Sequence, residues 1–108
     1  MIYELRTYNV TPGKMPALLD RFDKITLDFW KTYGFRPIGF WTVVIGESNQ
    51  VLYYMLQWDS LADREKKWAA FQSDPDWIAK RAETEKNGAL VASISNEILQ
   101  PTSFSALQ

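Results

Sequence analysis

The fold is decided by residues 51–77, which read VLYYMLQWDSLADREKKWAAFQSDPDW. The segment Val51–Trp58 is rich in aromatic and branched side chains, which favours a β-strand. Ser60 then precedes a helical pattern, and the spacing Ser-x-x-Asp resembles a capping box. The pair Asp74-Pro75 starts a second helix, because Asp is a good N-cap and proline fits the first helical position. A strand and two helices therefore follow one another here without a linker.

A long helix is predicted over residues 12–33. Thr11 is expected as its N-cap, Pro12 as its first residue and Gly34 as the residue that ends it. Its apolar side chains recur every three or four residues, which is typical of an amphipathic helix. These residues are Met15, Leu18, Leu19, Phe22, Ile25, Phe29 and Tyr33. We expect this apolar face to cover a sheet.

The order of the elements indicates the fold class. Strands are predicted at residues 2–10, 35–45, 51–58 and 93–100, and helices at 12–33, 61–72 and 75–86. The order β-α-β-β-α-β is the ferredoxin-like arrangement of an α+β protein, with a four-stranded antiparallel sheet and helices on one face. The chain is expected to form a single domain over residues 1–108, with a tail that is frayed from about residue 102.

Both faces of the third predicted strand are apolar. On one face, Val51, Tyr53 and Met55 alternate with Leu52, Tyr54, Leu56 and Trp58 on the other. An antiparallel sheet with helices on one face commonly carries polar side chains on the other face. The simplest cover for the second apolar face is another copy of the same sheet. We therefore expect a homodimer.

The composition argues against several classes of function. Twelve basic and thirteen acidic residues give a formal net charge of -1. Because no basic run is present, we expect no binding to nucleic acid or to an anionic membrane surface. The sequence shows no signal peptide, no apolar stretch of about 18 residues and no cysteine, so we expect a cytoplasmic protein.

The chain contains neither histidine nor cysteine. This absence removes imidazole and thiolate mechanisms and the usual ligands of zinc, copper and haem. Pairs of carboxylates at the helix starts are explained by capping and by the helix dipole. We therefore expect no metal site and no cofactor.

Aromatic residues make up 15% of the chain, which is more than a core of this size needs. Some of these rings should therefore line a pocket or an interface. Five side chains are candidates for ligand binding: Arg6, Tyr8, Trp41, Tyr54 and Trp58. We expect a pocket under the first helix, bordered by Arg6, Tyr8, Tyr54 and Trp58.

Arg6 allows two interpretations. As a structural residue, it would form an ion pair with Glu4 or with Glu97 on another strand. As a binding residue, its guanidinium would anchor a carboxylate or enolate oxygen of a ligand. Arg64 and Trp77 are assigned to structural roles, Arg64 against Trp68 or in a bridge to Asp59 or Asp63.

Several segments together resemble the NIPSNAP family. They are IYELRTY at residues 2–8, WDSLADRE at 58–65, WAAF at 68–71, DPDW at 74–77 and PTSFS at 101–105. The resemblance implies a dimeric α+β barrel, in which two ferredoxin-like sheets pair. Relatives in that superfamily include cofactor-free monooxygenases, haem-degrading enzymes and lactone isomerases. Family members often carry a histidine on the third strand, whereas this chain has Tyr53-Tyr54, so an imidazole mechanism does not carry over.

Two functions remain open from the sequence. The first is a domain that binds a small apolar or aromatic metabolite between sheet and helices, as a cofactor-free oxygenase or isomerase or simply as a binder. The second is a non-enzymatic protein-interaction domain or a structural dimer domain. The sequence names no catalytic base, so it does not decide whether the protein is an enzyme.

Overall fold

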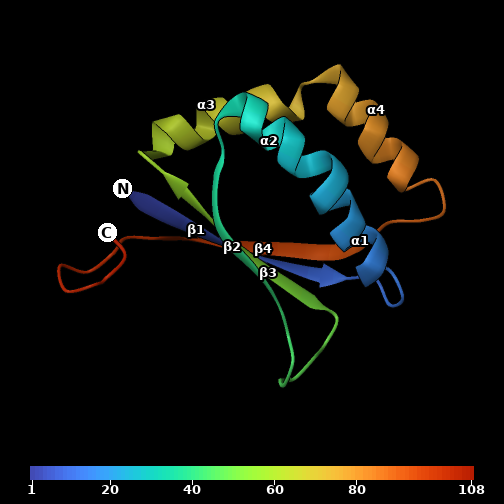
Figure 1. Cartoon of the computed structure of the whole chain (residues 1–108), viewed down its shortest axis with the longest axis horizontal. Helices are drawn as coiled ribbons and strands as arrows, with labels where there is room; N and C mark the ends of the chain where they lie inside the picture. Colours follow the sequence, from blue (N-terminus) through green and yellow to red (C-terminus); the bar gives the residue numbers. More distant parts are fainter.

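Four antiparallel strands form the sheet, in the order β2-β3-β1-β4. They are β1 (Ile2–Val10), β2 (Arg36–Thr42), β3 (Val51–Trp58) and β4 (Val91–Leu99). The computed structural model describes all 108 residues, and Figure 1 shows every helix on the same side of the sheet. The predicted ferredoxin-like α+β fold is confirmed.

The helices begin where the sequence provides caps. α3 (Leu61–Gln72) starts after Ser60, whose side chain accepts a hydrogen bond from the backbone N–H of Asp63 at 3.1 Å. α4 (Pro75–Thr84) starts after Asp74, whose carboxylate accepts from the backbone N–H of Asp76 at 2.8 Å. Both predicted N-caps are confirmed, because each satisfies a backbone donor at a helix start.

The first helix starts later than the sequence predicts. It begins with α1 (Met15–Arg21), so the prediction of Thr11 as N-cap is wrong. Gly13 has a φ of +82°, which lies outside the helical region, and residues 11–14 form a turn closed by the Lys14 N–H on the Thr11 carbonyl. Gly34 ends the helix as predicted, with a φ of +78°.

A π-helical turn, η1 (Phe22–Thr26), interrupts this helix before α2 (Leu27–Tyr33). A π turn holds one residue more than an α turn, so the residues after it are rotated around the helix axis. Trp30 is therefore buried, at 2% exposure, whereas Phe29 is only half-buried and packs against Trp77. The predicted apolar stripe left out Trp30 and included Leu19, which is 39% exposed, whereas its later members Phe29 and Tyr33 are partly buried and pack against the core as predicted.

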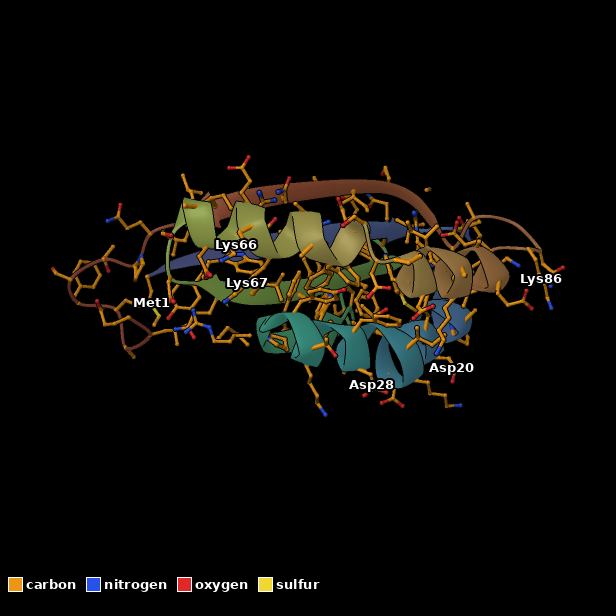
Figure 2. The ribbon with its side chains drawn as sticks, turned by 90° about the horizontal axis from the view of Figure 1, so that it is seen from above. Met1, Asp20, Asp28, Lys66, Lys67 and Lys86 are labelled. Carbon is orange, nitrogen blue, oxygen red and sulfur yellow. The ribbon has the colours of Figure 1, made fainter.

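Aromatic rings fill the space between the helices and the sheet. Trp30 stacks on Phe35 with 5.1 Å between ring centroids, and Phe22 meets the edges of Trp30 and Tyr54 at 5.7 and 5.3 Å. Figure 2, seen from above the helices, shows side chains crowded between α3–α4 and the first helix, while Asp20, Asp28 and Lys86 lie at the rim. None of the helices is long and apolar enough to cross a membrane.

The opposite face of the sheet has no cover within the chain. The even-numbered residues of β3 face the helices and are buried, whereas Tyr53 on the other face is 36% exposed. Trp41 pairs with Tyr53 across the β2–β3 ladder and is 49% exposed. β2 ends at Thr42 rather than at residue 45, so Val44 and Ile45 lie exposed in a loop that projects away from the helices (Figure 1).

The C-terminal segment folds back towards the start of the chain. The Tyr3 hydroxyl donates to the backbone carbonyl of Gln108, and the Gln108 side chain donates to the Thr102 carbonyl at 2.9 Å. The two termini lie close together at one end of the sheet (Figure 1). Where the sequence predicted a frayed tail, the structure describes a turn held by these hydrogen bonds, with Phe104 exposed.

Candidate functional site

A buried carboxylate organises the helix-facing side of β1. Glu4 is fully buried and accepts hydrogen bonds from five side chains: Arg6, Arg64, Asn96, Trp58 and Trp68. Burial alone would raise the pKa of Glu4, but the hydrogen bonds from Arg64 and Asn96 and the charge of Arg6 outweigh it and lower this pKa to about 2. Glu4 is therefore ionised in the folded protein at neutral pH.

Glu4, Arg6 and Arg64 together form what we call the Glu4 cluster. Arg64 donates to both carboxylate oxygens of Glu4, with Nε at 2.8 Å and Nη2 at 3.0 Å. Its structural ion pair is therefore with Glu4 and not with Asp59 or Asp63. Two guanidinium groups share one carboxylate, which leaves the cluster with one unneutralised positive charge. A ligand with an anionic oxygen would therefore be attracted to this side of the sheet.

Arg6 forms the structural ion pair with Glu4 that the sequence offered as one of its two interpretations. Its Nη1 donates to Glu4 at 3.0 Å, its Nε donates to the Tyr54 hydroxyl at 2.7 Å, and its Nη2 makes no hydrogen bond within the chain. The guanidinium lies 4.7 Å from the ring centroid of Trp68, a cation–π distance. Burial would lower the pKa of Arg6, but Tyr54, Tyr8 and Glu4 raise it, so this residue stays charged.

The hydroxyl groups of Tyr8 and Tyr54 extend this arrangement. Their oxygens are 2.8 Å apart, and Arg6 and Tyr54 are direct partners in the β1–β3 ladder. Tyr54 accepts from Arg6, so its own proton has only the Tyr8 oxygen as an acceptor. Donation from Tyr54 to Tyr8 then leaves the Tyr8 proton free, and the chain of hydrogen bonds strengthens it as a donor. Burial raises the pKa of Tyr54 well above its usual value, so Tyr54 stays protonated.

A cleft of about 790 Å³ opens beside this hydrogen-bonded chain. It lies between the helices and the β1–β4 side of the sheet, where no helix covers β4. Ile94 on β4 faces the helices yet is 50% exposed, and Figure 2 shows β4 running outside the line of α3 and α4. Twelve of the nineteen residues that line the cleft are hydrophobic, which suits an apolar ligand. Arg6, Tyr8 and Trp68 belong to its wall.

Three further residues of the wall carry buried donors that have no partner. They are Arg21 with its Nε, Thr26 with its hydroxyl and Trp30 with its indole N–H. All three residues belong to the helix that contains the π turn. Such π turns are frequently found at functional sites. None of the three belongs to the apolar stripe that the sequence pattern predicts, and the π turn changes the direction of the side chains that follow it. No sequence signal indicated this turn.

The structure brings some of the sequence-predicted site residues together and separates others. Arg6 and Tyr8 line the cleft, and Tyr54 lies behind them as their hydrogen-bond partner. Trp58 is fully buried and donates to Glu4 at 3.1 Å, away from the cleft wall. Trp41 lies on the opposite, uncovered face of the sheet. No group of three or more acidic, histidine or cysteine side chains is placed to hold a metal ion.

Comparison with known proteins places this geometry in context. The NIPSNAP family model matches residues 3–106. Protein NipSnap homolog 3A from Homo sapiens is 27% identical over 77 residues, a match that covers 71% of this chain and 30% of that protein. The chain thus spans about a third of the length of the curated relatives that it matches.

Solved structures share the fold along the whole chain. Protein Atu4242 from Agrobacterium tumefaciens superimposes with a TM-score of 0.86 at 28% identity, with all of both chains covered. An uncharacterized NIPSNAP-like domain protein from Burkholderia xenovorans gives 0.84 at 25% identity, covering 96% of this chain and 87% of the other. A putative antibiotic biosynthesis monooxygenase from Chloroflexus aurantiacus shares the fold alone, with a TM-score of 0.57 at 16% identity and full coverage of both chains.

Proposed function

This chain belongs to the NIPSNAP family, and on that premise we propose that its cleft binds a small, flat, apolar molecule that carries an anionic oxygen. One observation carries the proposal: an apolar cleft of about 790 Å³ has the charged Arg6 in its wall, and Nη2 of this arginine has no partner within the chain. A buried guanidinium is stabilised by acceptors, so a ligand oxygen is its natural partner.

The polar groups at this end of the cleft support an acceptor-bearing ligand. Arg6 offers Nη2, and Tyr8 offers the hydroxyl proton that the Tyr54 contact leaves free. Arg6 can only donate, and the Tyr8 hydroxyl has a proton available to donate, so both groups can bind an acceptor on a ligand. The ring of Trp68 beside Arg6 supplies an apolar surface on which a flat molecule can stack.

The same geometry favours binding over catalysis. Glu85 is the only carboxylate among the residues that line the cleft, and its Oε1 is paired with Arg21 at 3.0 Å. A cofactor-free oxygenase or isomerase needs a base that takes a proton from its substrate. Arg6 and Tyr8 would stabilise an enolate oxygen, but the cleft provides no unpaired base to form one. We therefore place the binding function first.

Calorimetric titration with 2-naphthoate tests the proposal. This probe combines a flat apolar body with one carboxylate, and 2-naphthalenemethanol serves as its neutral counterpart. We expect 2-naphthoate to bind and the alcohol to bind at least about tenfold more weakly. Because a charge-assisted hydrogen bond contributes about 1.5–3 kcal/mol, Arg6→Met should weaken 2-naphthoate binding by about tenfold or more.

Arg36→Met provides the matched control for this titration. Arg36 also pairs with a carboxylate, Asp59 at 2.8 Å, but it lies on the surface and outside the cleft. Its substitution should change the affinity by less than about twofold, since surface pairs contribute little. Tyr8→Phe, which removes a single hydroxyl, should weaken binding while the protein stays folded. Absence of binding, or equal losses in Arg6→Met and Arg36→Met, would refute the proposed function.

We further propose that two copies pair through the uncovered faces of their sheets. Tyr53 and Trp41 are partly exposed on that face, and Leu5 lies next to Met55 across the β1–β3 ladder. Exposed apolar surface of this kind commonly marks an interaction site. The pairing would give the dimeric barrel that the resemblance implies.

Light scattering after size exclusion tests the pairing. At micromolar concentration the mass should be twice the 12.5 kDa of the chain. Tyr53→Lys should shift the population towards monomer, because it places a charge in an apolar contact. Lys66→Glu on the helical side should leave the mass unchanged. A monomeric wild-type protein would exclude the dimer.

A further inference from the structure

The far end of the cleft repeats the charge pattern of the Glu4 cluster. Arg21 is 6% exposed, and its Nη1 donates to Glu85 at 3.0 Å and to the Thr84 hydroxyl at 3.2 Å. Arg81 approaches the same oxygen of Glu85, with its Nε at 3.7 Å. Two arginines again share one carboxylate, so this end also keeps one positive charge without a partner.

Donors of the first helix connect the two ends of the cleft. Arg21 Nε, the Thr26 hydroxyl and Trp30 Nε1 are buried without a partner, and all three residues line the cleft. Buried donors are normally satisfied by the protein, by water or by a ligand. Neither Nε nor Nη2 of Arg21 donates a hydrogen bond within the chain. Both nitrogens of this guanidinium can therefore donate to an acceptor group on a ligand.

The first helix sets the spacing of the residues that it contributes to the two ends of the cleft. Trp30 lies at the Arg6 end, with its ring 5.5 Å from Tyr54 and 6.3 Å from Trp68. Arg21 precedes Trp30 by about two and a half helical turns, which corresponds to roughly 13 Å along the axis. The apolar part of the cleft wall includes Phe22 and Phe71.

The charges along the cleft favour an anion with two ends. Three arginines and one glutamate line it, a net charge of +2, whereas the whole chain has a formal net charge of -1. The positive charge is therefore concentrated in the cleft and divided between its two ends. A ligand with a single anionic group leaves one end unneutralised.

We infer that the ligand class is a two-ended acid: a flat apolar body with an anionic oxygen at each end, one held by Arg6 and Tyr8 and the other by Arg21. This inference rests on the proposed function of the cleft and specifies the chemistry of its occupant. Thr26 and Trp30 add donors along the body, which suits a molecule with further oxygen substituents.

Titration with a matched pair of probes tests this inference. The pair is biphenyl-4-carboxylate and biphenyl-4,4′-dicarboxylate, which differ only in the second anionic group. We expect the wild-type protein to bind the diacid at least about tenfold more tightly than the monoacid, since a charge-assisted contact is added. In Arg21→Met this advantage should fall to about twofold or less, and Arg21→Lys should retain part of it. Arg36→Met should keep the full advantage.

The outcomes separate this inference from the function on which it rests. Equal affinities of the wild-type protein for the two acids would overturn the two-ended ligand while the single-acid function stands. A diacid advantage that persists in Arg21→Met would also overturn it. Failure of both acids to bind would refute the proposed function and this inference together. Because each variant is judged by the ratio of two ligands, a general loss of stability does not imitate the expected result.

Discussion

Glu4→Gln is expected to lower the free energy of unfolding by about 3–5 kcal/mol, because it leaves the largely buried Arg6 and the partly buried Arg64 without their shared carboxylate. Arg6 and Arg64 both donate to Glu4, and the Glu4 side chain is fully buried. Urea denaturation followed by tryptophan fluorescence, at a fixed protein concentration, measures the loss. Glu65→Gln on α3 is the control, since Glu65 is exposed and forms no salt bridge, and it should change stability by less than about 0.5 kcal/mol.

The same carboxylate links stability to pH. Its pKa is about 2 in the folded protein against an ordinary value of 4.5, so the unfolded chain binds the proton more readily. The stabilisation is therefore complete above about pH 4.5 and is lost as the pH falls to about 2, and it amounts to on the order of 3 kcal/mol. Glu4→Gln should lack this part of the acid dependence. Parallel acid profiles of the wild type and Glu4→Gln would contradict the assigned role.

Trp30→Ala is expected to cost about 3–5 kcal/mol of stability, which is the usual loss for a large ring removed from a packed core. Trp30 stacks on Phe35 and contacts the edges of Phe22 and Phe71. Phe29→Ala, one residue earlier, should cost clearly less, about 1–2 kcal/mol, because Phe29 is only half-buried beside Trp77 and gains only part of the burial free energy of a Phe side chain.

This pair of variants tests the rotation that the π turn introduces. A regular α-helix with the predicted stripe would place Phe29 in the core, and the order of the two losses would then be reversed. Thermal or urea unfolding of both variants decides between these arrangements. Equal losses would mean that neither side chain dominates the contact with the sheet.

Local sequence patterns were sufficient to predict most of the fold. Alternating side chains gave the bounds of β1 and β3, and short-range capping by Ser60 and Asp74 gave the starts of α3 and α4. Those features depend on a few neighbouring residues. The π turn cannot be predicted in this way, because no residue in 22–26 is a sequence signal for it. It becomes apparent only in the folded core, where Trp30 is packed.

The candidate site was predictable only in part. The neighbourhood of Arg6 and Tyr54 followed from the topology, since the order β-α-β-β-α-β makes the first and third strands neighbours. The position of the cleft depends on which strand the helices leave uncovered. The sequence pattern does not predict which strand that is. The sequence allows Trp41 to lie on either face of the sheet, depending on the register, and a shift in the β2–β3 ladder between Pro37 and Gly39 precedes its pairing with Tyr53 on the uncovered face.

The five tryptophans provide the most direct test of the central claim that the cleft beside Arg6 is the binding site. Their indole N–H signals in a ¹H–¹⁵N spectrum report separate places, with Trp68 beside Arg6 and Trp41 on the opposite face of the sheet. Titration with 2-naphthoate should shift the signals of Trp68 and Trp30 and leave that of Trp41 in place. A shift confined to Trp41, or no shift at Trp68 on saturation, would contradict the assignment of the cleft as the site.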